Sequence, residues 1–301
     1  MSSVDAPSPV PTPFTPSTVI YATDFFPPAE NAGRFASLLA RQFNAELLVV
    51  HTFVLTQAAM EAEAKTGAAV KSNQRQECEA ALAKIARHYG EGTRTASTLL
   101  EGDPQEQLPR LEREHAPAIL VMGTEGRGRL ERPLLGSVAK KVLRSAVGPA
   151  LTVGPQVPSA PGDTAQIRRI LFATTLAPGA GRGAACALAM IQAFHAEMDV
   201  LHVVRPELAS NADELEQAQQ RFQESVEPLS YEHAHRVSSP RGVLTIGDHA
   251  PAHILDHVRE NSIDLLVLSL SWRSHLWAES LVSVAFQVIA HAPCPVLTIL
   301  G

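Results

Sequence analysis

A set of small residues in the first half of the chain has the types and spacing of a phosphate-binding loop. Residues 122–138 read MGTEGRGRLERPLLGSV, with Gly123 three residues before Gly126 and the pair Gly136 and Ser137 ten residues further on. An apolar run precedes this loop and a helical pattern follows it. Because glycine lets the backbone approach an anion, and a helix start offers N–H groups and the positive end of a dipole, the pattern favours a phosphate site.

Two better-known phosphate loops do not fit this segment. It lacks the G-K-[ST] sequence of a P-loop, and its glycines follow G-x-x-G rather than the G-x-G-x-x-G of dinucleotide-binding proteins. A glycine after a buried strand is often only a turn residue, so the spacing by itself is a weak signal. The loop also carries charges of both signs, from Arg127, Arg129 and Arg132 against Glu125 and Glu131.

The elements that must position this loop alternate between strands and helices. Apolar runs predict five strands in the first half, at residues 18–23, 46–53, 95–101, 118–122 and 149–153. Helical patterns fill the gaps, and Asp103 followed by Pro104 has the form of a helix N-cap. Strands that are apolar throughout are typical of a parallel sheet covered on both faces. We therefore expect an α/β fold with a doubly wound five-stranded parallel sheet.

The second half of the chain repeats the first. Val19 to Phe25 (VIYATDF) matches Ile170 to Leu176 (ILFATTL) at an offset of 151 (170 − 19), and Ile119 matches Leu265 at 146 (265 − 119). Near-constant offsets indicate two tandem domains of one fold. We expect a disordered tail at 1–16, a first domain at 17–154, a linker at 155–166 and a second domain at 167–301. Asp248 is the expected cap of the helix that corresponds to the one after Asp103.

The fold predicts where a ligand would bind. In a doubly wound sheet ligands bind at the carboxyl ends of the strands, where the winding reverses, here between strands one and four. Strand one ends at Asp24, strand four at Met122 and Gly123, and Thr52 borders the same edge. Asp24 could accept hydrogen bonds from a ribose hydroxyl or a base amine, while the glycine loop wraps the phosphates.

Composition narrows the class of protein. The 301 residues are 45% hydrophobic with a net charge of −6, so no basic field favours nucleic acid or an anionic membrane. No apolar run approaches the roughly 20 residues of a membrane span. The three cysteines form no C-x-x-C pair and the N-terminus has no signal-peptide pattern, which favours a reducing, cytoplasmic location.

The glycine loop and its flanks are similar to the ATP-binding signature of the universal stress protein family. The strand VMG, the spacing G-x-x-G with nine residues before G-S, the opening YATDF and the turn Gly102-Asp103-Pro104 all resemble that family. The resemblance implies a small α/β domain that binds ATP, with or without Mg²⁺. It assigns to nucleotide binding Ala22, Asp24, Thr52, Met122, Gly123, Gly126, Gly136, Ser137 and Val138. It also implies that the last strands of two domains pair, here 150–153 with 296–299, and leaves open a further dimer of chains.

The second domain departs from the signature. Ser269, Trp272 and Val282 stand where the three glycines stand in the first domain, and Thr175 stands where Asp24 does, while Ser283 remains. Added bulk where phosphate must meet backbone predicts a domain that does not bind ATP in the same way.

The function that this resemblance implies is nucleotide-responsive regulation under stress, through an unknown protein partner and with slow or no ATP hydrolysis. Two alternatives remain open: a scaffold whose nucleotide is structural, and a slow ATPase that uses Glu125 or Glu131. His249, His253 and His257 recur every fourth residue and could bind zinc or nickel, although a solvated helix face explains them as well.

Overall fold

The structure is a computed structural model that describes residues 12–53, 64, 70–124, 135–158, 166–176, 180–231, 239–270 and 278–300. The chain divides into two compact units. The first unit is Thr15–Ala165, and the second is Gln166–Gly301 together with the residues up to Phe14.

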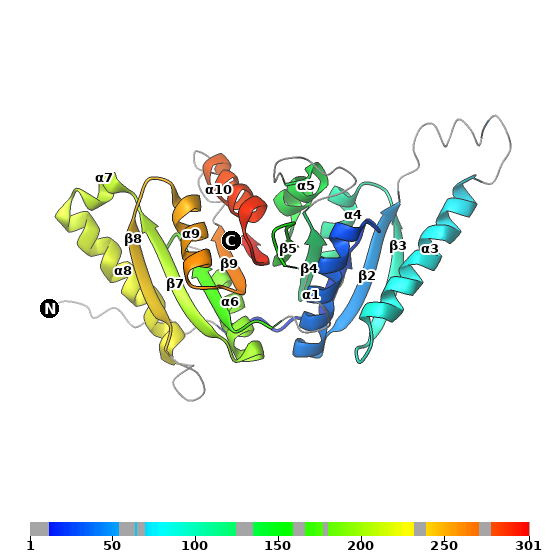
Figure 1. Ribbon diagram of the computed structural model, residues 1–301, viewed down its shortest axis with the longest axis horizontal. Helices are drawn as coiled ribbons and strands as arrows, with labels where there is room; N and C mark the ends of the chain where they lie inside the picture. The colour runs from blue at the N-terminus through cyan, green and yellow to red at the C-terminus, as the bar shows by residue number, and fades with distance from the viewer. Residues whose placement is uncertain are drawn as a thin grey trace. The chain divides into compact units, whose positions relative to one another are not determined.

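The first unit contains a five-stranded parallel sheet in the order β3-β2-β1-β4-β5 (Figure 1). The order reverses at β1, which pairs with both β2 and β4, as the sequence predicts. The strands are β1 (Thr18–Ala22), β2 (Glu46–Phe53), β3 (Thr95–Glu101), β4 (Ala118–Gly123) and β5 (Ala150–Val153). The helices named in this unit are α1 (Pro27–Phe43), α3 (Val70–Tyr89), α4 (Pro104–Glu114) and α5 (Ser137–Ser145).

The second unit repeats this topology, with strand order β8-β7-β6-β9-β10 and parallel pairing. Its strands are β6 (Arg169–Ala173), β7 (Glu197–Val204), β8 (Arg241–Ile246), β9 (Leu265–Leu270) and β10 (Val296–Leu300). Its helices are α6 (Ala180–Phe194), α7 (Pro206–Ala209), α8 (Ala212–Tyr231), α9 (Ala250–Glu260) and α10 (Ala278–His291). The predicted α/β class and doubly wound sheets are thus confirmed.

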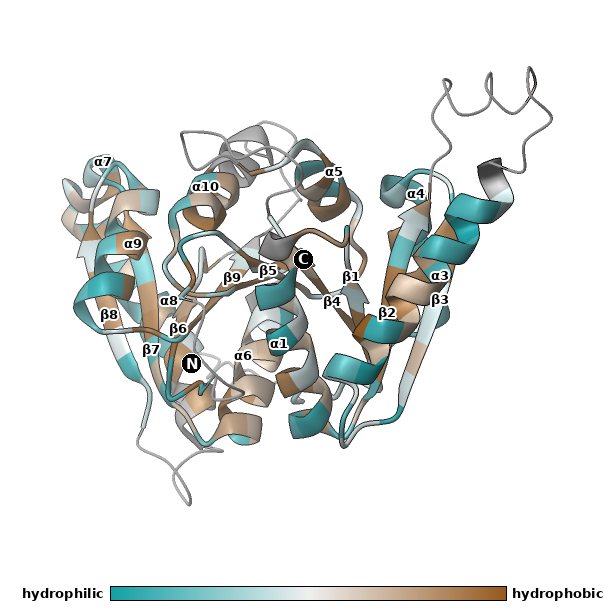
Figure 2. Ribbon diagram, turned by 45° about the vertical axis from the view of Figure 1, so that its right-hand side comes forward, coloured by the Kyte–Doolittle hydropathy of each residue, from teal (hydrophilic) through white to brown (hydrophobic). Residues whose placement is uncertain are grey.

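The central strands form the core because helices cover both of their faces. Ile20, Leu120 and Val121 of the first unit and Leu171 and Leu266 of the second have no exposed surface. Figure 2 shows the corresponding brown strands and the teal outer faces of helices such as α3. None of the described helices is both long enough and apolar enough to span a bilayer.

Alternate residues of each strand point to opposite faces of the sheet, and each face is covered by different helices. The Tyr21 hydroxyl donates to the Ala29 carbonyl of α1 at 2.6 Å, and its ring meets that of Tyr89 of α3 edge to face, with centroids 5.8 Å apart. Tyr21 therefore points toward α1 and α3. Because side chains alternate along a strand, Ala22 points to the opposite face, where α4 packs against α5 (Figure 1).

The ends of two matching helices differ from one another. Asp103 caps α4 as predicted, since its side chain accepts a hydrogen bond from the Gln105 N–H at 2.8 Å. The prediction for Asp248 is wrong, because the residue before α9 is His249 and its side chain makes no capping hydrogen bond to that helix.

The N-terminal tail expected at residues 1–16 is described only from residue 12. There the Phe14 N–H donates to the Ala185 carbonyl of α6 at 3.2 Å, so this end of the segment is packed.

One buried carboxyl group should make the stability of the first unit depend on pH. Glu112 of α4 is 3% exposed, and its Oε2 accepts the Val147 N–H at 3.1 Å. Burial raises the pKa of Glu112, and the Val147 and Gly148 N–H groups only partly offset this. As the pH rises above 4.5, the ordinary pKa of this group, Glu112 loses its carboxyl proton in the unfolded chain before it does so in the folded chain. The free energy of unfolding therefore falls as pH rises, until the folded pKa is passed.

We expect Glu112→Gln to flatten this part of the stability profile, because an amide does not titrate. The parent should lose up to about 1.36 kcal/mol of unfolding free energy per pH unit in this window relative to the variant. Denaturant unfolding from about pH 4.5 upward measures the difference. Glu106→Gln, on the exposed face of α4, is the matched control and should follow the parent. Parallel profiles of Glu112→Gln and the parent would contradict this prediction.

Candidate functional site

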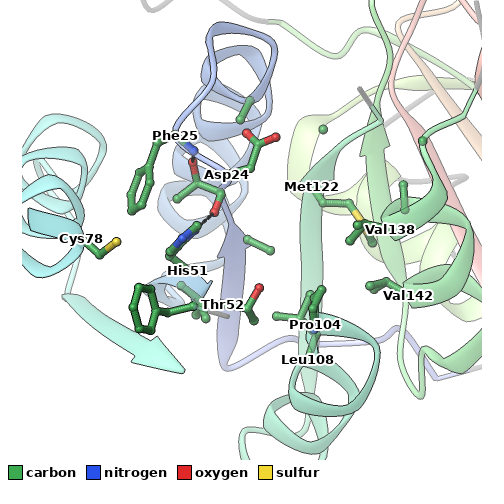
Figure 3. A pocket seen from close by; sticks show the side chains of 18 of the residues that line it. Asp24, Phe25, His51, Thr52, Cys78, Pro104, Leu108, Met122, Val138 and Val142 are labelled. Carbon is green, nitrogen blue, oxygen red and sulfur yellow. Dashed lines mark hydrogen bonds between the residues drawn. The ribbon is translucent and has the colours of Figure 1, made fainter. Parts of the chain in front are cut away.

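A cavity of about 880 Å³ opens at the carboxyl ends of β1, β2 and β4, in the first unit (Figure 3). It lies where the strand order reverses, which is where ligands bind in doubly wound folds. Its size falls within the range of small-molecule sites. The winding of the sheet therefore places a hollow at the edge where the sequence predicts one.

Eight of the nine predicted site residues line this cavity. The strand ends contribute Ala22, Asp24, Thr52, Met122 and Gly123, and α5 and the residue before it contribute Gly136, Ser137 and Val138. Gly126 lies outside the described residues, as do the charged residues of the same loop, 125–134. Residues distant in sequence thus share one cavity because β1 and β4 are neighbours.

Asp24 occupies a tight turn between β1 and α1. Its Oδ1 accepts the Phe26 N–H at 3.1 Å, and Thr23 Oγ1 accepts the Phe25 N–H at 3.1 Å. Phe25 has a φ of 68°, an uncommon left-handed conformation for a residue with a side chain. These bonds fix the carboxylate at the cavity rim, while only one of its two oxygens is used by the turn.

Gly136 is predicted to be a glycine because phosphate approaches the backbone there. The packing around it also requires a glycine. Its N–H donates to the Thr124 carbonyl at 2.8 Å, and a Cβ added to it would lie 2.9 Å from that carbonyl oxygen. A phosphate would therefore meet the N–H groups of Ser137, Val138 and Ala139 rather than that of Gly136. These three begin α5, and the first N–H groups of a helix have no acceptor within it.

The cavity is also lined by residues outside the nine that the sequence predicts. Pro104 and Leu108 of α4 form an apolar wall on the α4 and α5 side. Gln74, Glu77 and Cys78 of α3 form a wall on the other side. Their only sequence signal is helical spacing, which identifies one face of a helix but not what that face covers.

His51 is a packed and hydrogen-bonded residue at the end of β2. Its Nδ1 lies 2.7 Å from the Thr23 carbonyl oxygen, and its ring lies against that of Phe25, with centroids 4.1 Å apart. In the second unit His202 Nδ1 likewise lies 2.8 Å from the Thr174 carbonyl oxygen. Burial lowers the pKa of His202, because it disfavours the charged form of the ring. The pair is thus a structural feature of the repeated fold.

The residues that replace the signature in the second unit are only partly described. Ser269 is 4% exposed, and a Cβ on Gly183 of α6 would lie 2.5 Å from the Ser269 Cβ. Thr175, in the place of Asp24, is exposed. Trp272 and the side chains of Val282 and Ser283 lie outside the described part of the chain. Ser269 of β9 is therefore packed against α6.

The three histidines that lie four residues apart, His249, His253 and His257, have different surroundings. His249 precedes α9, His253 lies against Gly247, and His257 Nε2 lies 2.8 Å from Asp199 Oδ2. Burial would raise the pKa of Asp199, but bonds from Arg241 and His257 outweigh it and lower that pKa. In the described ranges no three His, Cys, Asp or Glu side chains are grouped as a metal ion requires.

Comparison with known proteins agrees with the fold and the repeat. The family model described as "Universal stress protein family" matches the chain twice, over residues 16–154 and 166–299. The chain belongs to the universal stress protein family. The two matches cover nearly the whole chain, so this member of the family is a tandem of two domains.

Individual relatives are distant in sequence. A universal stress protein of Methanocaldococcus jannaschii is 27% identical over 136 residues, which cover 45% of this chain and 80% of that protein. Among solved structures, a universal stress protein from Archaeoglobus fulgidus has a TM-score of 0.73 and 17% identity, covering 95% of this chain and 99% of its own. A putative universal stress protein from Pseudomonas aeruginosa has a TM-score of 0.61 and 15% identity, covering 95% and 93%. These structures support the fold alone.

Proposed function

We propose that the first unit of this universal stress protein binds ATP and that the bound nucleotide regulates the protein's response to stress. Hydrolysis of the nucleotide is slow or absent in this proposal, and Mg²⁺ accompanies ATP if it is required. The second unit, with Ser269 in place of a glycine, does not bind ATP in the same way.

One observation carries the proposal: a single cavity brings together a carboxylate, Asp24, and the start of a helix, at Ser137. The carboxylate suits a hydroxyl or amine of a nucleoside, and the helix start suits phosphate oxygens. The cavity also has apolar walls, such as Met122 and Leu108, against which a base can pack. These are the chemical requirements of a nucleotide in one site.

Calorimetric titration of the full chain with ATP tests the proposal. We expect about one ATP per chain, because the second unit lacks the corresponding residues. Two equivalent sites would contradict the proposed division between the units. No heat of binding, together with no protection of Cys78 from alkylation by ATP, would contradict ATP binding itself.

Cys78 provides an independent reading of where ATP binds. It lines the cavity, whereas Cys186 and Cys294, the other two cysteines, are 3% and 4% exposed. Burial raises the pKa of each buried thiol to about 12, which suppresses its thiolate. Alkylation at mildly alkaline pH should therefore modify Cys78 first. Saturating ATP should slow this reaction, because the bound nucleotide covers the cavity through which the reagent reaches Cys78, without filling the space beside the thiol. Calorimetric binding without any protection would place the nucleotide outside this cavity.

Two further measurements separate regulation from the alternatives. A single-turnover assay with Mg·ATP should show release of phosphate that is far slower than nucleotide exchange; rapid turnover would favour an ATPase. Binding of ATP that changes neither partner affinity nor oligomeric state would favour a scaffold. The pairing of residues 150–153 with residues 296–299, and the association of whole chains, stay predictions.

A further inference from the structure

The cavity of the first unit extends over both faces of the sheet. Tyr21 pairs in register with Val49, so His51 and Phe53 share the face that α1 and α3 cover. Ala22 pairs with Met122 and Val50, so Thr52 and Met122 share the opposite face, with α4 and α5. Figure 3 shows Phe25, His51 and Cys78 on the α3 side of β1, and Met122, Val138 and Val142 on the other. The cavity therefore has two compartments, joined across the ends of β1 and β2.

The α3-side compartment is aromatic and held in place. The Phe25 ring lies against His51, and the bond from His51 to the Thr23 carbonyl fixes the imidazole. Phe53, 8% exposed, and the thiol of Cys78 complete its apolar lining. Because these groups are already packed or bonded, the compartment presents a formed surface to a planar apolar group.

The charges described around this compartment disfavour phosphate. Its rim carries the carboxylates of Asp24 and Glu77. Arg75 of α3 contacts Glu79 at 2.9 Å and Glu101 at 2.7 Å, which neutralise it. A ligand should therefore place its phosphates at the start of α5 and its uncharged end toward α3.

Among its described residues, the second unit has a different arrangement. There the ring beside His202 is Phe222 of α8, with centroids 6.3 Å apart and 25° between the planes. Phe222 is 8% exposed, so the helix itself supplies the aromatic group that packs toward this histidine. In the first unit α3 presents the small side chain of Cys78 to the cavity instead. The α3-side compartment is thus a feature of the unit that has the phosphate site.

We propose that the two compartments together bind a purine nucleotide whose exocyclic amine carries a second, planar apolar group. This inference rests on the proposed function and names the class of nucleotide. Phosphates at α5, beside β4, leave the base at the ends of β1 and β2, about 10 Å away across two strand spacings. A substituted amine keeps one N–H, which Asp24 accepts, and directs its substituent past Asp24 toward Phe25 and Cys78.

A pair of probes, ATP and N6-benzyl-ATP, tests the inference with the full chain. The benzyl ring would be removed from water by Phe25, Phe53 and Cys78, so we expect N6-benzyl-ATP to bind at least about tenfold more tightly than ATP. Cys78→Trp fills the compartment and should bring the ratio of the two dissociation constants to about one. Gln76→Trp adds the same side chain to the exposed opposite face of α3 and should keep the parent ratio.

A second variant keeps the test decisive if Cys78→Trp does not fold. Phe25→Gly removes the stacked ring at a backbone φ that glycine adopts freely, and should also reduce the ratio to about one. Equal or weaker binding of N6-benzyl-ATP by the parent would overturn this inference while leaving ATP binding intact. Failure of both nucleotides to bind would overturn the proposed function as well. Loss of ATP binding in folded Cys78→Trp would show that the base itself fills the α3 side, which also overturns the inference.

Discussion

Val138→Glu is expected to weaken ATP binding by about a hundredfold, which corresponds to about 2.7 kcal/mol. Val138 is in the first turn of α5, is 52% exposed and lines the cavity. A carboxylate there would lie among the N–H groups that we expect to hold phosphate. Two like charges about 5 Å apart repel by roughly 1–3 kcal/mol at effective dielectric constants between those of water and a protein surface.

The same substitution should not harm the fold, because a negative charge at the start of a helix is favourable. This makes it a cleaner test than substitution of Gly136, where any side chain would collide with the Thr124 carbonyl. ATP affinity is measured by calorimetry beside Val138→Gln, which has the shape without the charge and should bind ATP nearly as the parent does. Adenosine, which has no phosphate, should bind both variants alike. Parent-like ATP affinity in Val138→Glu would place the phosphates elsewhere.

Gly183→Ala is expected to destabilise the second unit by about 1–3 kcal/mol, although alanine is the better helix former by about 1 kcal/mol. The added Cβ would lie 2.5 Å from the Ser269 Cβ, which is closer than two carbons can approach. Gly181→Ala, on the exposed side of α6 with no neighbour within 4 Å, is the matched control and should be neutral or stabilising. Both tryptophans, Trp272 and Trp277, belong to this unit, so their fluorescence during denaturant unfolding follows its stability.

Ser269→Gly should relieve the collision when it is combined with Gly183→Ala. Asn44 and His195 both have left-handed backbones and lie 151 residues apart (195 − 44). The same offset relates Ala32 to Gly183. The double variant thus copies the first unit, where Ala32 and Gly123 are the corresponding residues. We expect a favourable coupling of about 1–3 kcal/mol in the double-mutant cycle. Additive effects would show that Ser269 and Gly183 do not interact. The serine at position 269, where the first unit has Gly123, would then need another explanation.

The sequence was sufficient for features that depend on neighbouring residues. Apolar runs located the five strands of the first unit to within a residue or two, and Asp103 was recognised as a cap because its chemistry is local. Asp248 fails by the same reasoning, since capping also requires the helix to begin at the next residue, and α9 begins one residue later. Strand order then followed from the rules of parallel sheets, which is why eight predicted residues line one cavity.

Tertiary structure alone decided what lies opposite each of these residues. The register of β1 with β2 determines that His51 and Thr52, adjacent in sequence, serve different compartments. The packing of α3 determines that Cys78 faces a cavity, while Phe222 of α8 packs against a histidine. Tertiary contacts also explain why Gly136 is a glycine, since a side chain there would collide with the Thr124 carbonyl. They likewise explain why Gly183 of α6 is a glycine, since it packs against Ser269 of β9. Local patterns report the propensity of a segment, but contacts across a sheet depend on register and on which helix covers which face.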